Sequence, residues 1–542
     1  MGYEEIEGTK NYVLNVRLVA QRKPDRVITD FRAGADPIGS LIDGEARDLL
    51  RVTYLKPLRD AENEMTPGMR SRLAQILKAH PIFQKNSSAE KHTLESIVEE
   101  ANSQIRKYFE PLPQKKIQQE GTNDTAGQIT SKINEFLNDF FPEGIEPQAH
   151  VDISGEELNT ILRRLELSLE KNKTGLGSLN LLYISAELLL LESSQNKGLR
   201  LALIEELEAH LHPQAQLRLI NFLQKESTKG QFILTTHSTT LGASINIENL
   251  IICKDNKVFP MGPNFTNLDP KNYDFLKRFL DATKANLFFA RGVIIVEGPA
   301  ENILIPALAQ IINRPLHRYG VSIVNVGGTA FSHYAKIFHR KDRQSIGIKV
   351  AVITDRDVKP LEWKNDNGIS PTTIENDQNK KKRFVNLSDL KSIDVELFMS
   401  PNWTLEYEIA LSNIYKKFYK LILWAEKIQN SKTGLPDGTV LTKVIAKAKA
   451  DVEQWNSSFD KDSRKREKIA FEIYHNTLLK KEISKTMVSQ LLAEYLLVSN
   501  NKADKKRDLQ KYLFQSKSIE YLLNAIYHVT KPKVDGEYDS DN

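Results

Sequence analysis

The stretch KVAVITDRDVKP, residues 349 to 360, ends an apolar, β-branched run on two aspartates, Asp355 and Asp357. Two carboxylates this close repel each other, and a strand end rich in valine and isoleucine offers them little solvent. A bound cation would compensate their charge. The pattern therefore indicates a cation site at the end of a buried strand.

A second acidic motif, VIIVEGPAE at 293 to 301, lies upstream in the same alternation of apolar runs and helical stretches. The order strand, helix, strand, helix, strand predicts a small parallel sheet whose functional edge lies at the carboxyl ends of its strands. Glu297 ends the first strand, and strand alternation is expected to point Asp355 and Asp357 to one side. Glu301 follows one helical turn later and can turn back toward the strand end.

These acids form a set of hard oxygen ligands without histidine or cysteine, which favours Mg²⁺ or Mn²⁺. Four carboxylates can hold two ions roughly 4 Å apart, and such a pair clamps the attacking and leaving oxygens of a phosphodiester. The alternative is that strand-end acids only cap the helices that follow them.

Another pair of acids ends the apolar run in LALIEELEAHLHP, residues 201 to 213, and FILTTHS at 232 to 238 ends on a histidine. In an ATP site, Glu205 would bind Mg²⁺ through water, Glu206 would polarise the attacking water and His237 would contact the γ-phosphate. The alternative is that the acids cap a turn and that the histidine is an ordinary hydrogen-bonded residue.

Two glycines and a serine, Gly175, Gly177 and Ser178, begin a buried helix in KTGLGSLNLLYIS. Exposed amides at a helix start attract phosphate oxygens, and small residues let a ligand approach. With the later acids and histidine, this motif resembles the signature of ABC-type ATPases, which contacts nucleotide held by the opposite subunit. The resemblance implies a dimer.

The phosphate-binding motif of such ATPases, G-x-x-x-x-G-K-[ST], occurs nowhere in the 542 residues. Three explanations are open: the chain lacks its natural N-terminal portion, another polypeptide supplies the motif, or nucleotide binding has been lost. We favour the first, because the opening strand has no domain start before it. ATP binding is then expected only with a Walker A segment supplied from elsewhere.

The motifs VIIVEGPAE, VNVGG (324 to 328) and ITDRD (353 to 357) together resemble a Toprim domain, the metal-binding module of topoisomerases, primases and some nucleases. An ABC-type head followed by Toprim resembles the overcoming-lysogenisation-defect (OLD) family of nucleases. The resemblance implies that Glu406 in TLEYEIAL adds a carboxylate to the metal site and that Lys485 lies near the scissile phosphate. The alternative interpretation is that Glu406 is a surface acid and Lys485 a solvated lysine on a helix.

Basic runs flank the acidic motifs. Lys380, Lys381, Lys382 and Arg383 form one run, and KDSRKREK at 461 to 468 forms another. They could neutralise DNA phosphates without reading bases, although such runs are often only solvated surface.

The fold expected is α/β: a partial ABC-type ATPase head over 1–285 with a helical, dimer-forming insertion at about 65–150, a Toprim parallel sheet over 286–411, and a helical region over 412–542. Residues 358 to 390 are expected to be a mobile loop. The balance of 75 basic and 70 acidic residues gives no strong net field. One cysteine, no signal peptide and no apolar run of about 18 residues indicate a soluble cytoplasmic protein without membrane contact.

The function expected from these features is that of an Mg²⁺- or Mn²⁺-dependent DNA endonuclease or nickase, regulated by its ATPase head. The family resemblance implies anti-phage defence, a homodimer or higher homo-oligomer, and a separate defence-system partner. Two alternatives stay open: a DNA-repair ATPase that binds DNA without cutting it, and a Toprim ribonuclease.

Overall fold

A computed structural model gives the structure of the chain, which divides into two compact units, residues 1–236 and 237–542. It describes residues 2–6, 9–13, 15–24, 26–34, 39–42, 52–55, 66–69, 71–83, 91–110, 126–140, 148–155, 157–167, 175–192, 200–228, 230–431 and 436–531. Among these residues, no helix is long and apolar enough to cross a membrane.

The first unit contains two antiparallel arrangements and one short parallel sheet. The antiparallel strands are β1 (Gly2–Ile6) with β2 (Thr9–Val13), and β3 (Val16–Arg22) with β4 (Val27–Ala33) and β5 (Ser40–Leu41). The parallel strands are β6 (Thr53–Leu55), β7 (Leu201–Ile204) and β8 (Gln231–Leu234), in that order. Leu55 and Ile204 are buried there, which anchors the strand end that carries Glu205 and Glu206.

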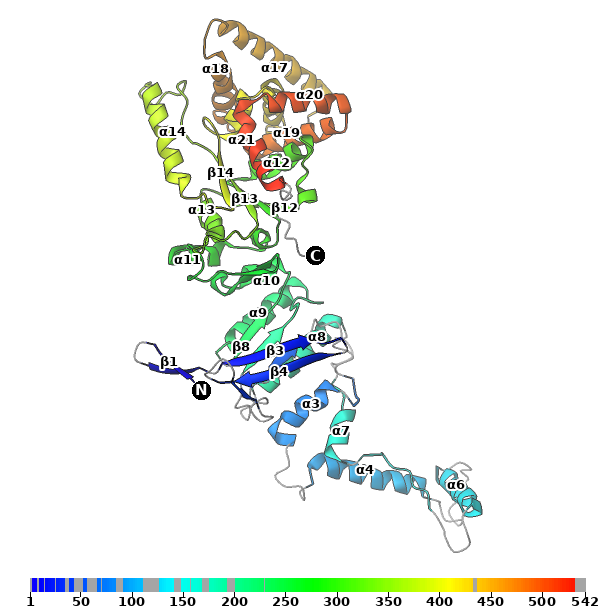
Figure 1. The fold of residues 1–542 in the computed structure, drawn as a ribbon. Coiled ribbons are helices and arrows are strands. Elements are labelled where there is room, and N and C mark those ends of the chain that lie inside the picture. The colour runs from blue at the N-terminus through cyan, green and yellow to red at the C-terminus, as the bar shows by residue number, and fades with distance from the viewer. Residues whose placement is uncertain are drawn as a thin grey trace. The chain divides into compact units, whose positions relative to one another are not determined.

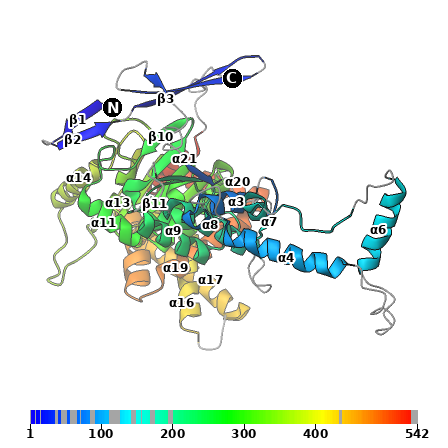
Figure 2. The same cartoon turned by 90° about the horizontal axis from the view of Figure 1, so that it is seen from below.

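Helices accompany these strands. They are α3 (Arg72–Ala79), α4 (Thr93–Phe109), α6 (Ala126–Phe140), α7 (Leu158–Arg164), α8 (Leu176–Glu192) and α9 (Pro213–Glu226). A capping box between His92 and Glu95 begins α4. Figures 1 and 2 show α4 and α6 extending away from the parallel strands. Residues 65–150 are thus largely helical where described, while 65, 70, 84–90, 111–125 and 141–147 lie outside the described residues. Dimerisation through this segment stays a prediction.

The second unit is built on a four-stranded parallel sheet in the order β12 (Val321–Asn325), β11 (Gly292–Val296), β13 (Lys349–Thr354), β14 (Val395–Met399). Alternate residues of the strands enter two separate cores. Ile294 and Ile353 join one core and Ile295 and Val352 the other. Both faces of the sheet are therefore covered, which explains why its strands read as continuous apolar runs.

Further helices and strands precede the helical region. They are α10 (Thr239–Ser244), β9 (Ile251–Lys254), β10 (Lys257–Pro260), α11 (Pro270–Phe279), α12 (Pro299–Ile311), α13 (Phe331–Ala335) and α14 (Thr373–Ser388). The helix α14 occupies much of the segment expected to be a loop. Thr372 and Glu375 form a capping box that begins it, so the expectation of a loop is wrong there.

The helical region consists of α15 (Leu405–Leu411), α16 (Tyr415–Gln429), α17 (Gly438–Ser458), α18 (Lys465–Phe471), a π-helix (Glu472–Leu479), α19 (Lys485–Asn500), α20 (Ala503–Phe514) and α21 (Glu520–Thr530). It shares one hydrophobic core with the sheet, because Leu304 of α12 and Leu492 of α19 belong to the same buried cluster as Ile294. Figure 1 shows α19 and α21 beside α12. The sheet and these helices therefore position a common site.

Candidate metal-binding site

Glu297 and Asp355 follow neighbouring parallel strands at the same edge of the sheet. The backbone N–H of Asp355 donates to Oε1 of Glu297 at 3.3 Å, and the Thr354 hydroxyl donates to the same oxygen. The pairing of β11 with β13 fixes this proximity, since both strands end at one level. The two motifs expected to converge lie in contact.

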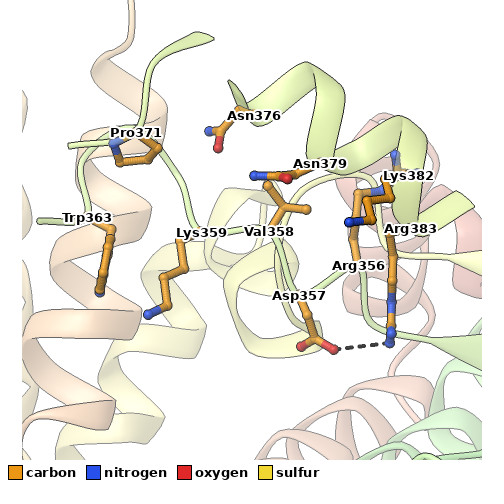
Figure 3. A pocket seen from close by; sticks show the side chains of 10 residues that line it. All are labelled: Arg356, Asp357, Val358, Lys359, Trp363, Pro371, Asn376, Asn379, Lys382 and Arg383. Carbon is orange, nitrogen blue, oxygen red and sulfur yellow. Dashed lines mark hydrogen bonds and ion pairs between the residues drawn. The ribbon is translucent and has the colours of Figure 1, made fainter. Parts of the chain in front are cut away.

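Asp355 and Asp357 have different surroundings. Strand β13 ends at Thr354, so the predicted alternation does not extend to Asp357, whose φ is +58°. The backbone N–H groups of Arg356 and Asp357 both donate to the Trp403 carbonyl at 3.1 Å, which turns the chain. Asp357 consequently projects outward with 54% of its side chain exposed, and its Oδ2 accepts from Nη2 of Arg383 at 3.2 Å (Figure 3).

Glu301 and Glu406 bring further carboxylates to this edge. Glu301 lies in the first turn of α12, which Gly298 and Pro299 begin directly after Glu297. Glu406 lies in the first turn of α15, only 3% exposed, and accepts from the Thr404 hydroxyl at 3.2 Å. Glu406 is therefore not the surface acid of the alternative interpretation.

Mutual repulsion among these acids is visible in their pKa values. Burial, followed by the charges of Glu406 and Glu297, raises the pKa of Glu301 to about 7. Burial also raises the pKa of Asp355 well above its ordinary value, and Glu406 and Glu301 raise it further. Burial raises the pKa of Glu297 as well. Ionisation of the cluster is costly unless positive charge enters it.

Lys485 supplies one such charge from the first turn of α19. Its Nζ lies 3.0 Å from Oε2 of Glu406 and 3.4 Å from the Tyr474 hydroxyl. Desolvation lowers the pKa of Lys485, but attraction to Glu406 outweighs it, so the net pKa is raised. Lys485 stays protonated beside the acids, contrary to the alternative of a merely solvated lysine.

The donor set fits a hard divalent cation, because every charged donor is a carboxylate oxygen. The side chains do not yet enclose an ion: within the described part of the chain, no three acidic, histidine or cysteine side chains surround a common point. Glu297 is engaged by Thr354 and Glu406 by Lys485. These contacts use Oε1 of Glu297 and Oε2 of Glu406, so each carboxylate could offer its other oxygen to an ion while it keeps its protein partners.

Sequence reasoning missed the residues that shape the turn after β13. The Ser400 hydroxyl accepts from the Arg356 N–H at 2.8 Å and donates to the Trp403 carbonyl at 3.0 Å. Glu408, fully buried, accepts from the N–H groups of Asn402 at 2.6 Å and Trp403 at 3.0 Å. The only signal in the sequence was a second acid two residues after Glu406, on what reads as an ordinary amphipathic helix.

A pocket of about 500 Å³ opens beside Asp357 (Figure 3). Its cationic lining residues are Arg356, Lys359, Lys382 and Arg383. Two asparagines and three uncharged residues, Val358, Trp363 and Pro371, line the rest of the wall beside Asp357. The Nζ of Lys359 lies 3.6 Å from the centre of the Trp363 ring, which restrains that ammonium group.

The two basic runs differ in their surroundings. Lys382 and Arg383 line the pocket, whereas the Nζ of Lys380 contacts Asn402 at 3.4 Å and Lys381 is exposed on α14. In the second run, intrachain contacts engage several cations: Arg464 pairs with Glu362 at 2.7 Å and Lys465 with Asp460 at 3.1 Å. The first run is therefore the better candidate for phosphate contacts.

The two glycines and the serine of the proposed ATPase signature lie at the start of a helix. Gly175 precedes α8, and Gly177 and Ser178 lie in its first turn. A Cβ on Gly177 would lie 2.6 Å from the His210 carbonyl oxygen, so the site requires glycine. Nucleotide contact by this turn stays a prediction.

The acids of the first unit follow the central strand of its parallel sheet. Glu205 follows β7 and accepts from the Tyr54 hydroxyl at 2.7 Å, and Glu206 adopts a φ of +46°. His237 follows β8 at the start of the second unit. Their proposed roles in nucleotide hydrolysis are predictions.

Family models match two parts of the chain. Residues 60–241 match the AAA ATPase domain, and residues 288–357 match the "Overcoming lysogenization defect protein-like, TOPRIM domain". The predicted order of an ATPase head followed by an OLD-like Toprim domain is confirmed, as is the α/β fold class with a helical C-terminal region.

Curated relatives include two proteins named Endonuclease GajA. The one from Bacillus cereus (strain HuB5-5) is 22% identical over 59% of this chain and 50% of its own length, and the one from strain VD045 is 30% identical over 30% and 27%. The Retron Ec83 probable ATPase of Escherichia coli is 25% identical over 40% of this chain and 41% of its own length. The chain thus spans half or less of the length of these relatives.

Solved structures with some likeness are the C-terminal regions of OLD proteins. That from Xanthomonas campestris pv. campestris is 21% identical with a TM-score of 0.26, covering 45% of this chain and 94% of its own. The C-terminal region of the Burkholderia pseudomallei OLD protein is 23% identical with a TM-score of 0.26, and the match covers 44% of this chain and 97% of that one.

Proposed function

We propose that this chain, in which an AAA ATPase domain precedes an OLD-like Toprim domain, is a divalent-metal-dependent endonuclease or nickase that acts on DNA. The observation that carries the proposal is the gathering of Glu297, Asp355 and their neighbouring acids at one sheet edge, where burial and then their mutual repulsion raise their pKa values. A site that so disfavours bare negative charge is suited to cations. The similarity of the chain to two proteins named endonucleases also supports cleavage of nucleic acid as the reaction.

Five carboxylates would hold the metal, and they are Glu297, Glu301, Asp355, Asp357 and Glu406. When bound, Mg²⁺ or Mn²⁺ supplies Lewis-acid stabilisation of phosphate oxygens, and two ions suit an in-line displacement. Lys485 holds its proton beside Glu406 and offers an N–H donor toward developing negative charge on the phosphate. Glu408 and Ser400 fix the turn that carries Arg356 and Asp357.

The pocket beside Asp357 would receive the DNA backbone. Four cations line it against one carboxylate, Asp357, which is itself a proposed metal ligand. Phosphate groups entering there would contact Arg356, Lys359, Lys382 and Arg383 while the metal site reaches the scissile bond. Such contacts position a duplex without reading its bases.

The first unit would act as a dimerising regulator. Glu205, Glu206 and the turn at Gly177 supply parts of a nucleotide site, while ATP would require a Walker A segment that these 542 residues do not contain. Because relatives include GajA endonucleases and a retron ATPase, we further propose a role in anti-phage defence, with a homodimer and a separate partner protein.

Supercoiled plasmid incubated with purified protein and Mg²⁺ or Mn²⁺ tests the nuclease proposal. We expect nicked or linear product that EDTA abolishes and that Asp355→Asn does not form. Asp366→Asn, which neutralises an exposed acid outside the cluster, is the matched control and should cut normally. Plasmid that is retarded on a gel yet stays covalently closed would instead support the non-cleaving DNA-binding ATPase.

Labelled RNA of the same sequence distinguishes the ribonuclease. Faster cutting of RNA than of DNA under matched metal conditions would overturn the choice of substrate while leaving the metal site intact. The defence role is tested by phage plating on cells that express the chain with its natural neighbours. Asp355→Asn should restore plaque formation there.

A further inference from the structure

Tyr521 lies in the first turn of α21, the last helix among the described residues, and is far in sequence from every proposed metal ligand. Two contacts fix the direction of this helix. At its far end, a Cβ added to Gly292 would lie 3.2 Å from Cβ of Val529, so Val529 is next to the start of β11. Just before its first residue, the Ser518 hydroxyl donates to the Glu408 carbonyl at 2.7 Å. The helix therefore runs opposite to the strands.

The lengths of the two elements place Tyr521 at the acidic edge. Eight residues of helix from Val529 back to Tyr521 span about 12 Å. Four residue steps along β11, from Gly292 to Val296, span about 13 Å. Tyr521 is thus level with the strand ends that carry Glu297 and Asp355. Figure 1 shows α21 alongside α12, and it packs against β11 and β13.

The hydroxyl of Tyr521 is enclosed but has no hydrogen-bond partner among the described residues. The residue is only 8% exposed and its ring belongs to the main hydrophobic core. The largest charge effects on it come from acids: Asp355, Glu408, Glu301 and Glu406. Burial, together with those charges, raises the pKa of Tyr521 well above its ordinary value, so the phenol keeps its proton and acts as a donor.

An enclosed hydroxyl without a partner is unfavourable, and phenylalanine would fill the same core space without that cost. Carboxylates that bind metals are themselves held by hydrogen bonds from outside the coordination shell. When a cation is bound, Asp355 must be ionised, and a nearby O–H donor would stabilise its outer oxygen. The unpaired donor and the ionised carboxylate would satisfy each other.

We infer that Tyr521 is a positioning residue of the proposed metal site: its hydroxyl donates to the carboxylate of Asp355 when a divalent cation is held there. The inference rests on the metal site of the proposed function. It extends that site to a helix near the end of the chain, so that the helical region orients a ligand as well as completing the core.

Tyr521→Phe tests the inference because it removes only the oxygen. We expect the melting temperature in EDTA to stay the same or rise, since no existing hydrogen bond is lost. The Kd for Mn²⁺, measured from free Mn²⁺ by electron paramagnetic resonance, should increase about 10-fold to 100-fold, as for other residues that support metal ligands. Tyr527→Phe, on the same helix but six residues nearer its end, should leave the Kd unchanged.

A double variant separates positioning from packing. In the Asp355→Asn background, where the acceptor has been altered and little Mn²⁺ is bound, Tyr521→Phe should not lower the melting temperature in EDTA, because the phenylalanine ring keeps the packing of the core. An unchanged Kd for Tyr521→Phe in the otherwise native chain, or a lower melting temperature in EDTA, would overturn the inference alone. A native chain that fails to bind Mn²⁺ at all would instead overturn the proposed function, and this inference with it.

Discussion

The ammonium nitrogen of Lys485 lies 3.0 Å from Oε2 of Glu406, although the two residues are 79 positions apart in the chain. This ion pair joins α19 to α15 at the edge of the parallel sheet. Glu406 is almost fully buried, while 40% of the Lys485 side chain is exposed. The lysine thus connects a buried acid to the solvent side of the site, where a phosphate would approach.

Replacing Lys485 with methionine should lower both stability and activity, for two different reasons. Loss of its partner leaves Glu406 buried and unpaired, which should lower the free energy of unfolding in EDTA by about 1–3 kcal/mol, a value reduced because the pair is partly exposed. DNA cutting should fall about 100-fold or more if the N–H donor stabilises phosphate charge. Urea unfolding and a plasmid nicking assay measure the two effects.

The variant Lys485→Met with Glu406→Gln provides the control for that prediction. Removing both charges should restore most of the lost stability, because no unpaired charge stays buried. Activity should stay low. Recovery of cutting in the double variant would show that Lys485 acts only through Glu406.

Metal binding should raise the melting temperature of the protein. Replacing one acid of the cluster with a neutral residue should give part of the same increase without metal. In EDTA, Asp355→Asn should melt at a higher temperature than the native chain, since it removes a carboxyl group whose ionisation is opposed by burial and by the neighbouring acids. Saturating Mn²⁺ should raise the melting temperature of the native chain. The same addition should have little effect on Asp355→Asn, and an equal rise in both proteins would contradict this assignment.

The sequence predicted the parallel sheet and the meeting of Glu297 with Asp355, because strand order and strand ends are local patterns. It did not predict that Asp357 turns outward, since that turn depends on the Trp403 carbonyl, 46 residues further along. The sequence contains the capping-box pattern of Thr372 and Glu375, but the polar composition of α14 favoured a loop over a helix there. The support from Glu408 and Tyr521 could not be predicted, because only the packing of α15 and α21 brings them to the sheet edge.

The stability of the metal-free protein should fall as pH rises from about 4.5 toward 7, and Glu408 is one cause. Burial raises its pKa from 4.5 to about 7, against hydrogen bonds from Asn402 and Trp403 that lower it. The folded state therefore binds more protons than the unfolded state across that range, and each unit of pH costs stability. The full shift corresponds to about 3 kcal/mol.

Glu408→Gln isolates that contribution. It keeps an acceptor for the N–H groups of Asn402 and Trp403 but cannot ionise. Urea unfolding in EDTA at pH 5 and pH 8 should show a smaller decrease for this variant than for the native chain. Identical decreases would mean that Glu408 does not carry the pH dependence.

DNA binding should depend on the cations of the pocket rather than on basic residues in general. Lys382→Ala with Arg383→Ala removes two charges that line it. We expect weaker binding to duplexes of any sequence. The plot of the logarithm of the DNA association constant against the logarithm of salt concentration should have a slope smaller in magnitude by about 2. Fluorescence anisotropy at several salt concentrations, with Ca²⁺ in place of Mg²⁺ to prevent cutting, gives both quantities.

Lys505→Ala with Arg507→Ala is the matched control for the pocket variant, since it removes the same charge from exposed positions on α20. It should leave affinity and slope nearly unchanged, because those side chains lie outside the pocket. Equal losses in both double variants would indicate a diffuse attraction of DNA to the whole unit. In that case the pocket beside Asp357 would have no special part in holding the strand that is cut.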